Sequence, residues 1–293
     1  MESRKIQESE LLINADGSIF HLHVNPQHLA ATVLLVGDPG RVPLVAKLFE
    51  TKECDISTRE FRTITGTFRG KRMTVVSTGI GCDNIDIVLN ELDALANIDF
   101  ETRTVKPTLR SLTVVRIGTC GGLQPFTPIG TYVASAFSIG FDGLLNFYGG
   151  RDAACRLDME AAFCRHMNWK GNQCIAHPYV VGADSELLER VAGEDMVRGI
   201  TVACGGFYGP QGRRLRLPLA DHEANAKIES FEWEGSRITN FEMESSAVAG
   251  LSKMMGHKAL TCCMVIANRL GGEADTRYKQ GIEGLIQTVL ERL

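Results

Sequence analysis

The chain has 293 residues, of which 44% are hydrophobic and 23% are charged, and its formal net charge is −4. This composition provides enough apolar side chains for a large core, and it lacks the basic excess that is typical of nucleic-acid-binding proteins. The longest apolar run, Ala259–Ala267, is about half of the roughly 18 residues that a membrane-spanning helix needs, so we expect no membrane segment.

The nine cysteines form no C-x-x-C pair, and residues 1–10 lack the apolar centre of a secretory signal. Both features indicate a reduced, cytoplasmic chain without a disulfide framework or a zinc site.

Apolar β-rich runs alternate with helical patterns along the chain, which predicts an α/β fold built in layers. We expect a single domain over residues 1–293, because α/β folds often reach this length without dividing. The expected strands are Thr32–Val36, Phe61–Phe68, Met73–Ser77, Thr113–Ile117, Thr131–Ser138, Ile175–Gly182, Ile200–Cys204, Ile238–Phe241 and Ala259–Ala267. The expected helices are Val42–Leu48, Asn84–Ala96, Met159–Met167, Glu186–Ala192, Met243–Met255 and Gly281–Leu293. Residues 97–111 and 151–157 have no clear pattern, and we interpret the first stretch as a long loop.

Three glycine-containing segments, two that follow expected strands and one that ends the central strand, lie at the edge of the sheet where α/β proteins bind ligands. They are Gly37–Arg41 (GDPGR), Thr78–Gly81 (TGIG) and Arg116–Gly122 (RIGTCGG). Glycine lets the backbone present N–H groups to an anion, the arginines add charge, and Thr119 adds a hydroxyl. The set predicts a site for free phosphate, although each turn alone is compatible with a simple chain reversal. A dinucleotide cofactor is weakly supported, because Gly79 and Gly81 lack the third glycine of that fingerprint.

Arg116 stands out because it lies in the otherwise apolar strand Thr113–Ile117, where an unpaired charge is costly to bury. Either a bound anion or a structural carboxylate could satisfy the guanidinium, and the sequence leaves both interpretations open.

The segment Asn240–Ser246 (NFEMESS) joins an expected strand to an expected helix and carries Glu242 and Glu244. Two carboxylates one residue apart can accept hydrogen bonds from a vicinal diol, such as that of ribose. One carboxylate could instead favour the positive N-terminus of the helix, but this does not explain the other.

The segment Phe207–Arg213 (FYGPQGR) places the amide of Gln211 and the guanidinium of Arg213 two positions apart, behind two aromatic rings. Together they can recognise an edge that alternates N–H and C=O groups, such as the imide of uracil, while a ring stacks on the base. Taken alone, the segment is equally compatible with an ordinary surface turn.

In this order along the chain, the motifs resemble those of the nucleoside phosphorylase superfamily, and they are most similar to those of uridine phosphorylases. The matching segments are Gly37–Arg41, Ser77–Gly81, Arg116–Thr119, Phe207–Arg213, Asn240–Ser245 and Asn268–Arg269. The resemblance runs from about Phe20 to the C-terminus and makes residues 1–18 an N-terminal extension. It implies a three-layer α/β fold with a mixed central sheet flanked by helices.

The resemblance also implies a role for each matching position. The phosphate ligands would be Gly37, Arg41, Arg59, Arg116 and Thr119. The ribose ligands would be His21, Glu242, Met243 and Glu244. The base ligands would be Phe207, Gln211, Arg213 and Arg269. The catalytic residues would be Arg116, Gln211, Arg213 and Glu244.

In this family two of these side chains come from a neighbouring subunit, which implies a homodimer or a hexamer of dimers with shared active sites. Arg59 would reach the neighbour's phosphate, and His21 the neighbour's ribose. A metal site at His21 and His23 is not expected, because no third ligand is evident. The chain reads Cys82–Asn84 where bacterial members carry Gly-Pro-Ser, so a monovalent cation is not expected either.

The implied reaction is reversible phosphorolysis of uridine, or of deoxyuridine, to uracil and the pentose 1-phosphate in pyrimidine salvage. Inorganic phosphate would be a co-substrate, and no cofactor would be needed. Purine phosphorylases and nucleosidases of the same fold typically carry a Ser-Asp motif where this chain has Asn268–Arg269. They remain alternatives, as does a non-catalytic nucleoside-binding protein, which would not need the phosphate ligands.

Overall fold

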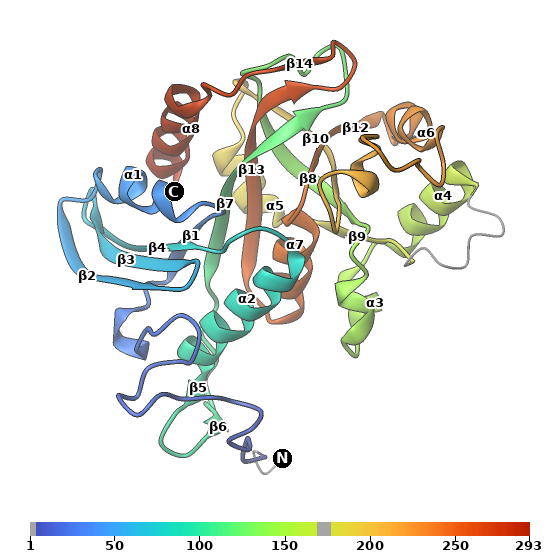
Figure 1. Ribbon diagram of the computed structural model, residues 1–293. Helices are drawn as coiled ribbons and strands as arrows, with labels where there is room; N and C mark the ends of the chain where they lie inside the picture. Colours follow the sequence, from blue (N-terminus) through green and yellow to red (C-terminus); the bar gives the residue numbers. More distant parts are fainter. Residues whose placement is uncertain (1–3, 169–176) are drawn as a thin grey trace.

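A mixed β-sheet runs through the centre of the computed structural model, which describes residues 4–168 and 177–293 (Figure 1). Its strands are β1 Thr32–Val36, β2 Thr51–Thr58, β3 Phe61–Phe68, β4 Lys71–Ser77, β7 Thr113–Gly122, β8 Tyr132–Gly140, β9 Tyr179–Gly182, β10 Met196–Ala203, β11 Glu232–Trp233, β12 Ser236–Glu242, β13 Lys258–Asn268 and β14 Glu273–Ala274. They lie in the order β11-β12-β10-β8-β13-β7-β1-β4-β3-β2, while β9 pairs with β8 and β14 with β13. A separate hairpin is formed by β5 Ile98–Asp99 and β6 Thr104–Val105.

The middle of the sheet is parallel. Strand β1 pairs in parallel with β4 and β7, and β7 pairs in parallel with β13. The apolar residues of these strands are buried on both faces, as expected where helices cover a parallel sheet. Their carboxyl ends therefore open at a common edge.

A second contact closes part of the sheet on itself. The end of β12 pairs antiparallel with the end of β7, so that Asn240 lies opposite Gly122 and Phe241 opposite Gly121. Because β12, β10, β8, β13 and β7 are already neighbours in that order, this pairing completes a ring of strands. The closure brings Glu242, at the end of β12, against the strand that carries Arg116.

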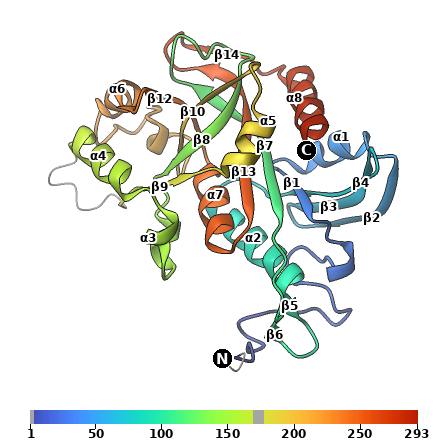
Figure 2. The same cartoon turned by 180° about the vertical axis from the view of Figure 1, so that it is seen from behind.

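Helices cover both faces of the sheet, as Figures 1 and 2 show from opposite sides. Helices α1 Val42–Ala46, α5 Ser185–Val191 and α8 Lys279–Arg292 pack on one face, and α2 Cys82–Asn97 and α7 Ser245–Met254 pack on the other. Helices α4 Leu157–Met167 and α6 Ala224–Ser230 pack near β10 and β12, and the short α3 spans Arg151–Ala154. The 3-10 turns are η1 Pro26–His28, η2 Pro39–Arg41, η3 Leu144–Phe147 and η4 Gly209–Gln211. Among the helices of the described residues, none has the length and hydropathy of a membrane-spanning segment.

The periodicity of α8 illustrates why these segments are helical. Its buried residues recur at spacings of three and four along the chain and form one apolar stripe: Ile282, Leu285, Ile286, Val289 and Leu290. This stripe packs against buried residues of β1, β7 and β13.

The predicted α/β fold with a mixed central sheet is confirmed, with differences at the ends of elements. The helix expected from Met243 begins at Ser245, and residues 97–111 contain the β5–β6 hairpin instead of a plain loop. Strand β2 was not predicted, because its sequence TKECDIST has no apolar run and its side chains are exposed or half-buried at the edge of the sheet. Of the expected strand Ile175–Gly182, residues 175–176 lie outside the described residues, and the observed strand begins at Tyr179.

Candidate active site

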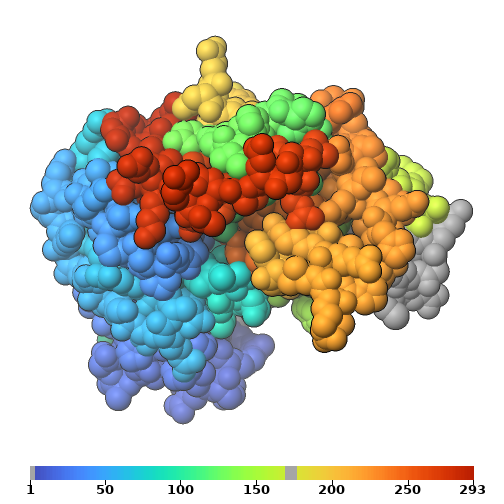
Figure 3. Space-filling model, turned by 45° about the horizontal axis from the view of Figure 1, so that its top comes forward, coloured from blue at the N-terminus to red at the C-terminus, as the bar shows by residue number. Residues whose placement is uncertain are grey.

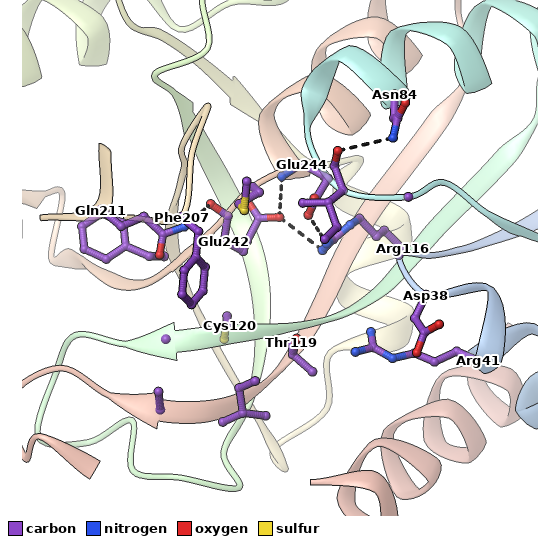
Figure 4. Close-up of a pocket in the computed structure, with 18 of the residues that line it drawn as sticks. Asp38, Arg41, Asn84, Arg116, Thr119, Cys120, Phe207, Gln211, Glu242 and Glu244 are labelled. Atoms are coloured by element: carbon purple, nitrogen blue, oxygen red, sulfur yellow. Dashed lines mark hydrogen bonds and ion pairs between the residues drawn. The ribbon is translucent and has the colours of Figure 1, made fainter. Parts of the chain in front are cut away.

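A cavity of about 700 Å³ lies at the carboxyl ends of β1, β7 and β12. Figure 3 shows the surface hollowed between the C-terminal segment, in red, and the orange segment beyond residue 200. Most of the residues predicted from the motifs line this cavity: Gly37, Arg41, Arg116, Thr119, Phe207, Gln211, Arg213, Glu242, Met243 and Glu244. Figure 4 shows Arg41 and Gln211 at opposite ends, with Arg116 and Glu244 between them.

The turn after β1 positions Arg41 at one end of the cavity. The Asp38 carboxylate accepts a hydrogen bond from Gly40 N at 2.8 Å, which holds the 3-10 turn η2 in place. The Arg41 residue is only 9% exposed, yet no carboxylate of the described residues forms an ion pair with it. Among the described side chains, only the Tyr278 hydroxyl lies within hydrogen-bonding distance of the Arg41 guanidinium, at 3.5 Å from Nη2. A buried guanidinium with unused donors is an expected feature of an oxyanion site.

Arg116 lies in the middle of the cavity and, unlike Arg41, has its positive charge neutralised by carboxylates. Its Nη1 is 3.2 Å from Glu242 Oε2, and its Nη2 contacts Glu244 Oε2. Burial opposes the positive charge, but the two carboxylates outweigh burial and raise the pKa of Arg116 above its usual value. The structural carboxylates that the sequence left open are therefore present in this structure, and there are two of them.

Backbone space at Gly118 allows the guanidinium of Arg116 to take this position. A Cβ added at Gly118 would lie 2.4 Å from Arg116 Nη1 and 2.9 Å from its Cζ. The side chain of Arg116 thus folds over a residue that has no side chain of its own.

Glu242 and Glu244 have different surroundings, although both line the cavity. The carboxylate of Glu242 accepts hydrogen bonds from Glu244 N at 2.8 Å, Ser245 N at 2.9 Å and Ser245 Oγ at 2.6 Å. These contacts satisfy the first turn of α7, so Glu242 has the helix-end role that the sequence considered for one of the two carboxylates.

Glu244 is the carboxylate with acceptor positions to spare. Its Oε1 accepts one hydrogen bond from Gly81 N at 2.7 Å, and its Oε2 contacts Arg116. Because each carboxylate oxygen can accept two hydrogen bonds, both oxygens can receive a further donor. Burial raises the pKa of Glu244, Arg116 opposes this effect, and the neighbouring charge of Glu242 adds to it.

The opposite end of the cavity is lined by the amide of Gln211 and the guanidinium of Arg213. Gln211 is buried, and its Nε2 donates to Glu242 O at 3.5 Å. The Arg213 guanidinium lies 3.7 Å from the centre of the Phe207 ring, donates to Phe207 O at 2.6 Å and contacts Gln211 Oε1. Burial and the nearby charge of Arg269 lower the pKa of Arg213 to about 10.

Arg269 borders this end without lining the cavity. Its Nη2 donates to Gly212 O at 3.2 Å, which links the residue after β13 to the loop that carries Gln211 and Arg213. Burial lowers the pKa of Arg269 as well. Two guanidinium groups without a carboxylate partner among the described residues make this end of the cavity favourable for negative charge.

His21 and Arg59 do not line the cavity of their own chain. The Arg59 guanidinium lies 5.7 Å from the centre of the Phe20 ring, and His21 Nδ1 contacts Glu91 at 2.6 Å. Glu60, which follows Arg59 in the turn between β2 and β3, does line the cavity. His21 and Arg59 therefore lie outside the cavity of their own chain, and Arg59 adjoins the turn whose Glu60 lines the cavity wall.

Sequence reasoning missed several wall residues, of which Asp38, Glu60, Asn84 and Tyr278 carry polar groups. Asp38 belongs to the GDPGR turn, but its residue type does not distinguish it from an ordinary turn residue. Tyr278 had no signal, because it lies in a polar stretch nine positions after Arg269 and comes back to the cavity only through the fold.

Comparison with known proteins places the chain in a family. The family profile described as "Phosphorylase superfamily" matches residues 31–292, so the chain belongs to that superfamily. A uridine phosphorylase of Thermococcus kodakarensis is 28% identical over 258 residues, covering 88% of this chain and 80% of that protein. A DeoD-type purine nucleoside phosphorylase of Geobacillus kaustophilus is 26% identical over 276 residues, covering 92% of this chain and 96% of that protein.

A solved structure agrees with the fold over nearly the whole chain. A nucleoside phosphorylase of Trypanosoma brucei, described as showing uridine phosphorylase activity, matches with a TM-score of 0.87 at 28% identity. The match covers 97% of this chain and 99% of that chain. The resemblance that the motifs indicated is thus confirmed at the level of the family and its fold.

Proposed function

We propose that this protein catalyses the reversible phosphorolysis of uridine or deoxyuridine to uracil and the pentose 1-phosphate. The observation that carries the proposal is the state of Arg41, a buried guanidinium without an ion pair among the described residues, whose one side-chain hydrogen bond there is the 3.5 Å contact with the Tyr278 hydroxyl. It shares one cavity with a carboxylate that can accept further donors, Glu244, and with the amide–guanidinium pair of Gln211 and Arg213.

Inorganic phosphate, as co-substrate, would bind at the Arg41 end. Gly37 allows close approach of the backbone, Thr119 supplies a hydroxyl, and Arg116 lies between this end and Glu244. In this position phosphate faces the anomeric carbon of a riboside whose base lies at the other end of the cavity. Holding both reactants in line accounts for a large part of the expected rate enhancement.

The ribose would lie against Glu244, with Met243 beside it. Cleavage of the glycosidic bond builds positive charge on the sugar ring, as in glycoside hydrolysis. An ionised Glu244 accepts hydrogen bonds from the ribose hydroxyls and favours that charge. Glu242 supports the site by holding Arg116 and the first turn of α7.

Uracil would leave as an anion stabilised at the Gln211 end. Gln211 and Arg213 form hydrogen bonds with its carbonyl and imide groups, Arg269 adds positive charge, and Phe207 packs against the ring. These interactions strengthen as negative charge develops on the base, which is the requirement for catalysis by electrostatic stabilisation. The reaction needs no metal and no organic cofactor.

The polar groups at the base end of the cavity lead us to expect a pyrimidine as the base, and not a purine. The carboxylates that line the cavity are Asp38, Glu60, Glu242 and Glu244. Glu242 lies next to Gln211, but its carboxylate is already engaged by the first turn of α7 and by Arg116. A purine phosphorylase needs an acid that protonates the departing base, whereas the base end here presents an amide and guanidinium groups. The names of the two uridine-active relatives support the same choice.

We further propose that two subunits share each site. His21 and Arg59 lie together outside the cavity, next to the wall residue Glu60. In a symmetric dimer, a residue at the rim of one site can complete the site of the partner. Arg59 would then contact phosphate, and His21 the ribose, in the neighbouring subunit.

The decisive experiment measures release of uracil from uridine with and without phosphate, with deoxyuridine and inosine assayed in parallel. We expect release only with phosphate, and cleavage of inosine at least about 100-fold more slowly. Release without phosphate would identify a nucleosidase, and preferred cleavage of inosine would identify a purine enzyme. Either result contradicts the proposal.

A further inference from the structure

Tyr278 is a wall residue of the cavity that none of the sequence motifs includes. It precedes helix α8, and its carbonyl oxygen accepts a hydrogen bond from Ile282 N at 3.1 Å. This bond within the first turn of the helix fixes the backbone from which the ring projects. The position of the ring is therefore set by α8, whose apolar stripe is part of the core.

The ring of Tyr278 lies against Arg41. This buried arginine of the cavity forms no ion pair with the described residues. Arg41 Cζ is 5.7 Å from the centre of the ring, and Arg41 Nη2 is 3.5 Å from the hydroxyl. The first distance is within the range of a cation–π interaction, and the second is at the limit of a hydrogen bond.

An aromatic face stabilises a guanidinium without using its N–H donors. The contrast with Arg116 is informative, because Glu242 and Glu244 neutralise that guanidinium and use its donors. A carboxylate in the position of Tyr278 would compete with an incoming oxyanion for Arg41. Tyr278 leaves the charge of Arg41 without a counter-ion, and its hydroxyl engages Nη2 only at the long distance of 3.5 Å, so the other donors stay available for an oxyanion.

We propose that Tyr278 is a positioning residue of the phosphate subsite, which acts through Arg41 and determines affinity for a tetrahedral oxyanion. The inference rests on the phosphate subsite of the function proposed above and adds a residue to it. Tyr278 should therefore affect the interaction with phosphate and leave the interaction with the nucleoside unchanged.

The test compares three substitutions at this position. Tyr278→Ala removes the ring, Tyr278→Leu keeps an apolar side chain without a π face, and Tyr278→Phe keeps the ring without the hydroxyl. Tyr132→Phe is the matched control, since the Tyr132 hydroxyl donates to Gly281 O at 2.9 Å in the same helix and does not contact Arg41.

We expect Tyr278→Ala and Tyr278→Leu to raise the KM for phosphate about tenfold, the factor that corresponds to a partly desolvated cation–π contact. The KM for uridine should stay within about twofold, and Tyr278→Phe should restore the KM for phosphate to within about threefold. The proposal is overturned if phosphate and uridine KM rise together, if Tyr278→Leu leaves the phosphate KM unchanged, or if Tyr132→Phe has the same effect as Tyr278→Leu.

A binding measurement separates this inference from the proposed reaction. Thermal unfolding is followed with increasing inorganic phosphate alone, without nucleoside. A given stabilisation of Tyr278→Leu should require about tenfold more phosphate than the same stabilisation of the wild type. If the wild type does not cleave uridine but this shift is found, the reaction is wrong and the role of Tyr278 holds. If the phosphate concentrations for wild type and variant coincide, the role of Tyr278 is wrong whatever the reaction.

Discussion

At the scale of single residues, Arg116 depends on the absence of a side chain at Gly118. The guanidinium lies where a Cβ of residue 118 would be, 2.4 Å from Nη1, and it is held there by two carboxylates. The sequence showed that an arginine interrupts an apolar strand, but it did not show which neighbour makes room for it.

We expect Gly118→Ala to reduce phosphorolysis about 100-fold, because the methyl group must displace Arg116 from Glu242 and Glu244 and an ångström-scale displacement is costly in an active site. The free energy of unfolding should fall by about 1–3 kcal/mol through overpacking. Steady-state kinetics and chemical denaturation measure the two effects. Gly149→Ala is the control, since no atom lies within 4 Å of a Cβ at that position. Wild-type kinetics in Gly118→Ala would contradict the assigned role of Arg116.

Glu244 gives the pH dependence of the site. Burial and the adjacent charge of Glu242 raise its pKa, with Arg116 opposing them. Only the ionised carboxylate favours a positively charged sugar, so activity should be lost as pH falls through this raised pKa. The acid limb of kcat should therefore lie above the ordinary carboxyl value of about 4.3.

Glu242→Gln tests the cause of this shift. It removes the neighbouring negative charge, so the pKa of Glu244 should fall and the acid limb should move to lower pH. The measurement is kcat against pH at saturating uridine and phosphate. Glu244→Gln is the control. This variant has no carboxyl group at position 244, so any acid limb that remains in its residual activity comes from the ionisation of phosphate. An identical acid limb in Glu244→Gln and the wild type would show that Glu244 does not titrate in this range.

At the scale of elements, the start of helix α7 connects stability to the site. Glu242 accepts hydrogen bonds from the first turn of α7 and also holds Arg116 at 3.2 Å. Glu244, two residues later, bonds to Gly81 N across the cavity wall. The sequence offered the helix end only as an alternative role for one of the two acidic residues, and the contacts show that Glu242 has it.

This division of roles predicts opposite rankings for stability and activity. Glu242→Ala should lower the free energy of unfolding by about 1–2 kcal/mol more than Glu244→Ala does, because it also removes the hydrogen bonds to the first turn of α7. Glu244→Ala should be the more damaging for the KM of uridine. Denaturant unfolding and steady-state kinetics of both variants provide the comparison. If Glu244→Ala is the less stable protein, the assignment of Glu242 to the helix end is incorrect.

The sequence predicted well those elements whose apolar residues follow a pattern that results from burial in the core. Strand β1 was predicted from the apolar run Thr32–Val36, and β7 from the run Thr113–Ile117 that only Arg116 interrupts, since both faces of these strands are covered. Strand β2 and the β5–β6 hairpin were missed, because their stability comes from pairing with neighbours and not from an apolar pattern of their own.

At the scale of the whole molecule, the motifs predicted which turns meet, because carboxyl ends of parallel strands share one edge of a sheet. They could not predict Tyr278, because it comes close to Arg41 only when α8 packs on the core residues of β1, β7 and β13. They also could not show that Arg41 is free of carboxylate partners while Arg116 has two. Partner choice among charged side chains depends on tertiary geometry and leaves no local pattern.

The proposed sharing of sites is a property of the assembly, and it can be tested by mixing two inactive proteins. Arg41→Ala damages the phosphate site of its own chain, whereas Arg59→Ala would damage only the site of the partner. A mixed dimer of the two variants contains one site with both arginines intact. Random reassembly of equal amounts should therefore recover about one quarter of wild-type activity, given a two-fold symmetric dimer.

The matched control mixes Arg41→Ala with Arg116→Ala. Both residues line the cavity of their own chain, so no combination of these two variants restores a site. Subunit exchange is verified by native mass spectrometry before the assay. If mixed Arg41→Ala and Arg59→Ala dimers form and stay inactive, each subunit completes its own site, and the position of Arg59 beside Phe20, outside the cavity, needs another explanation.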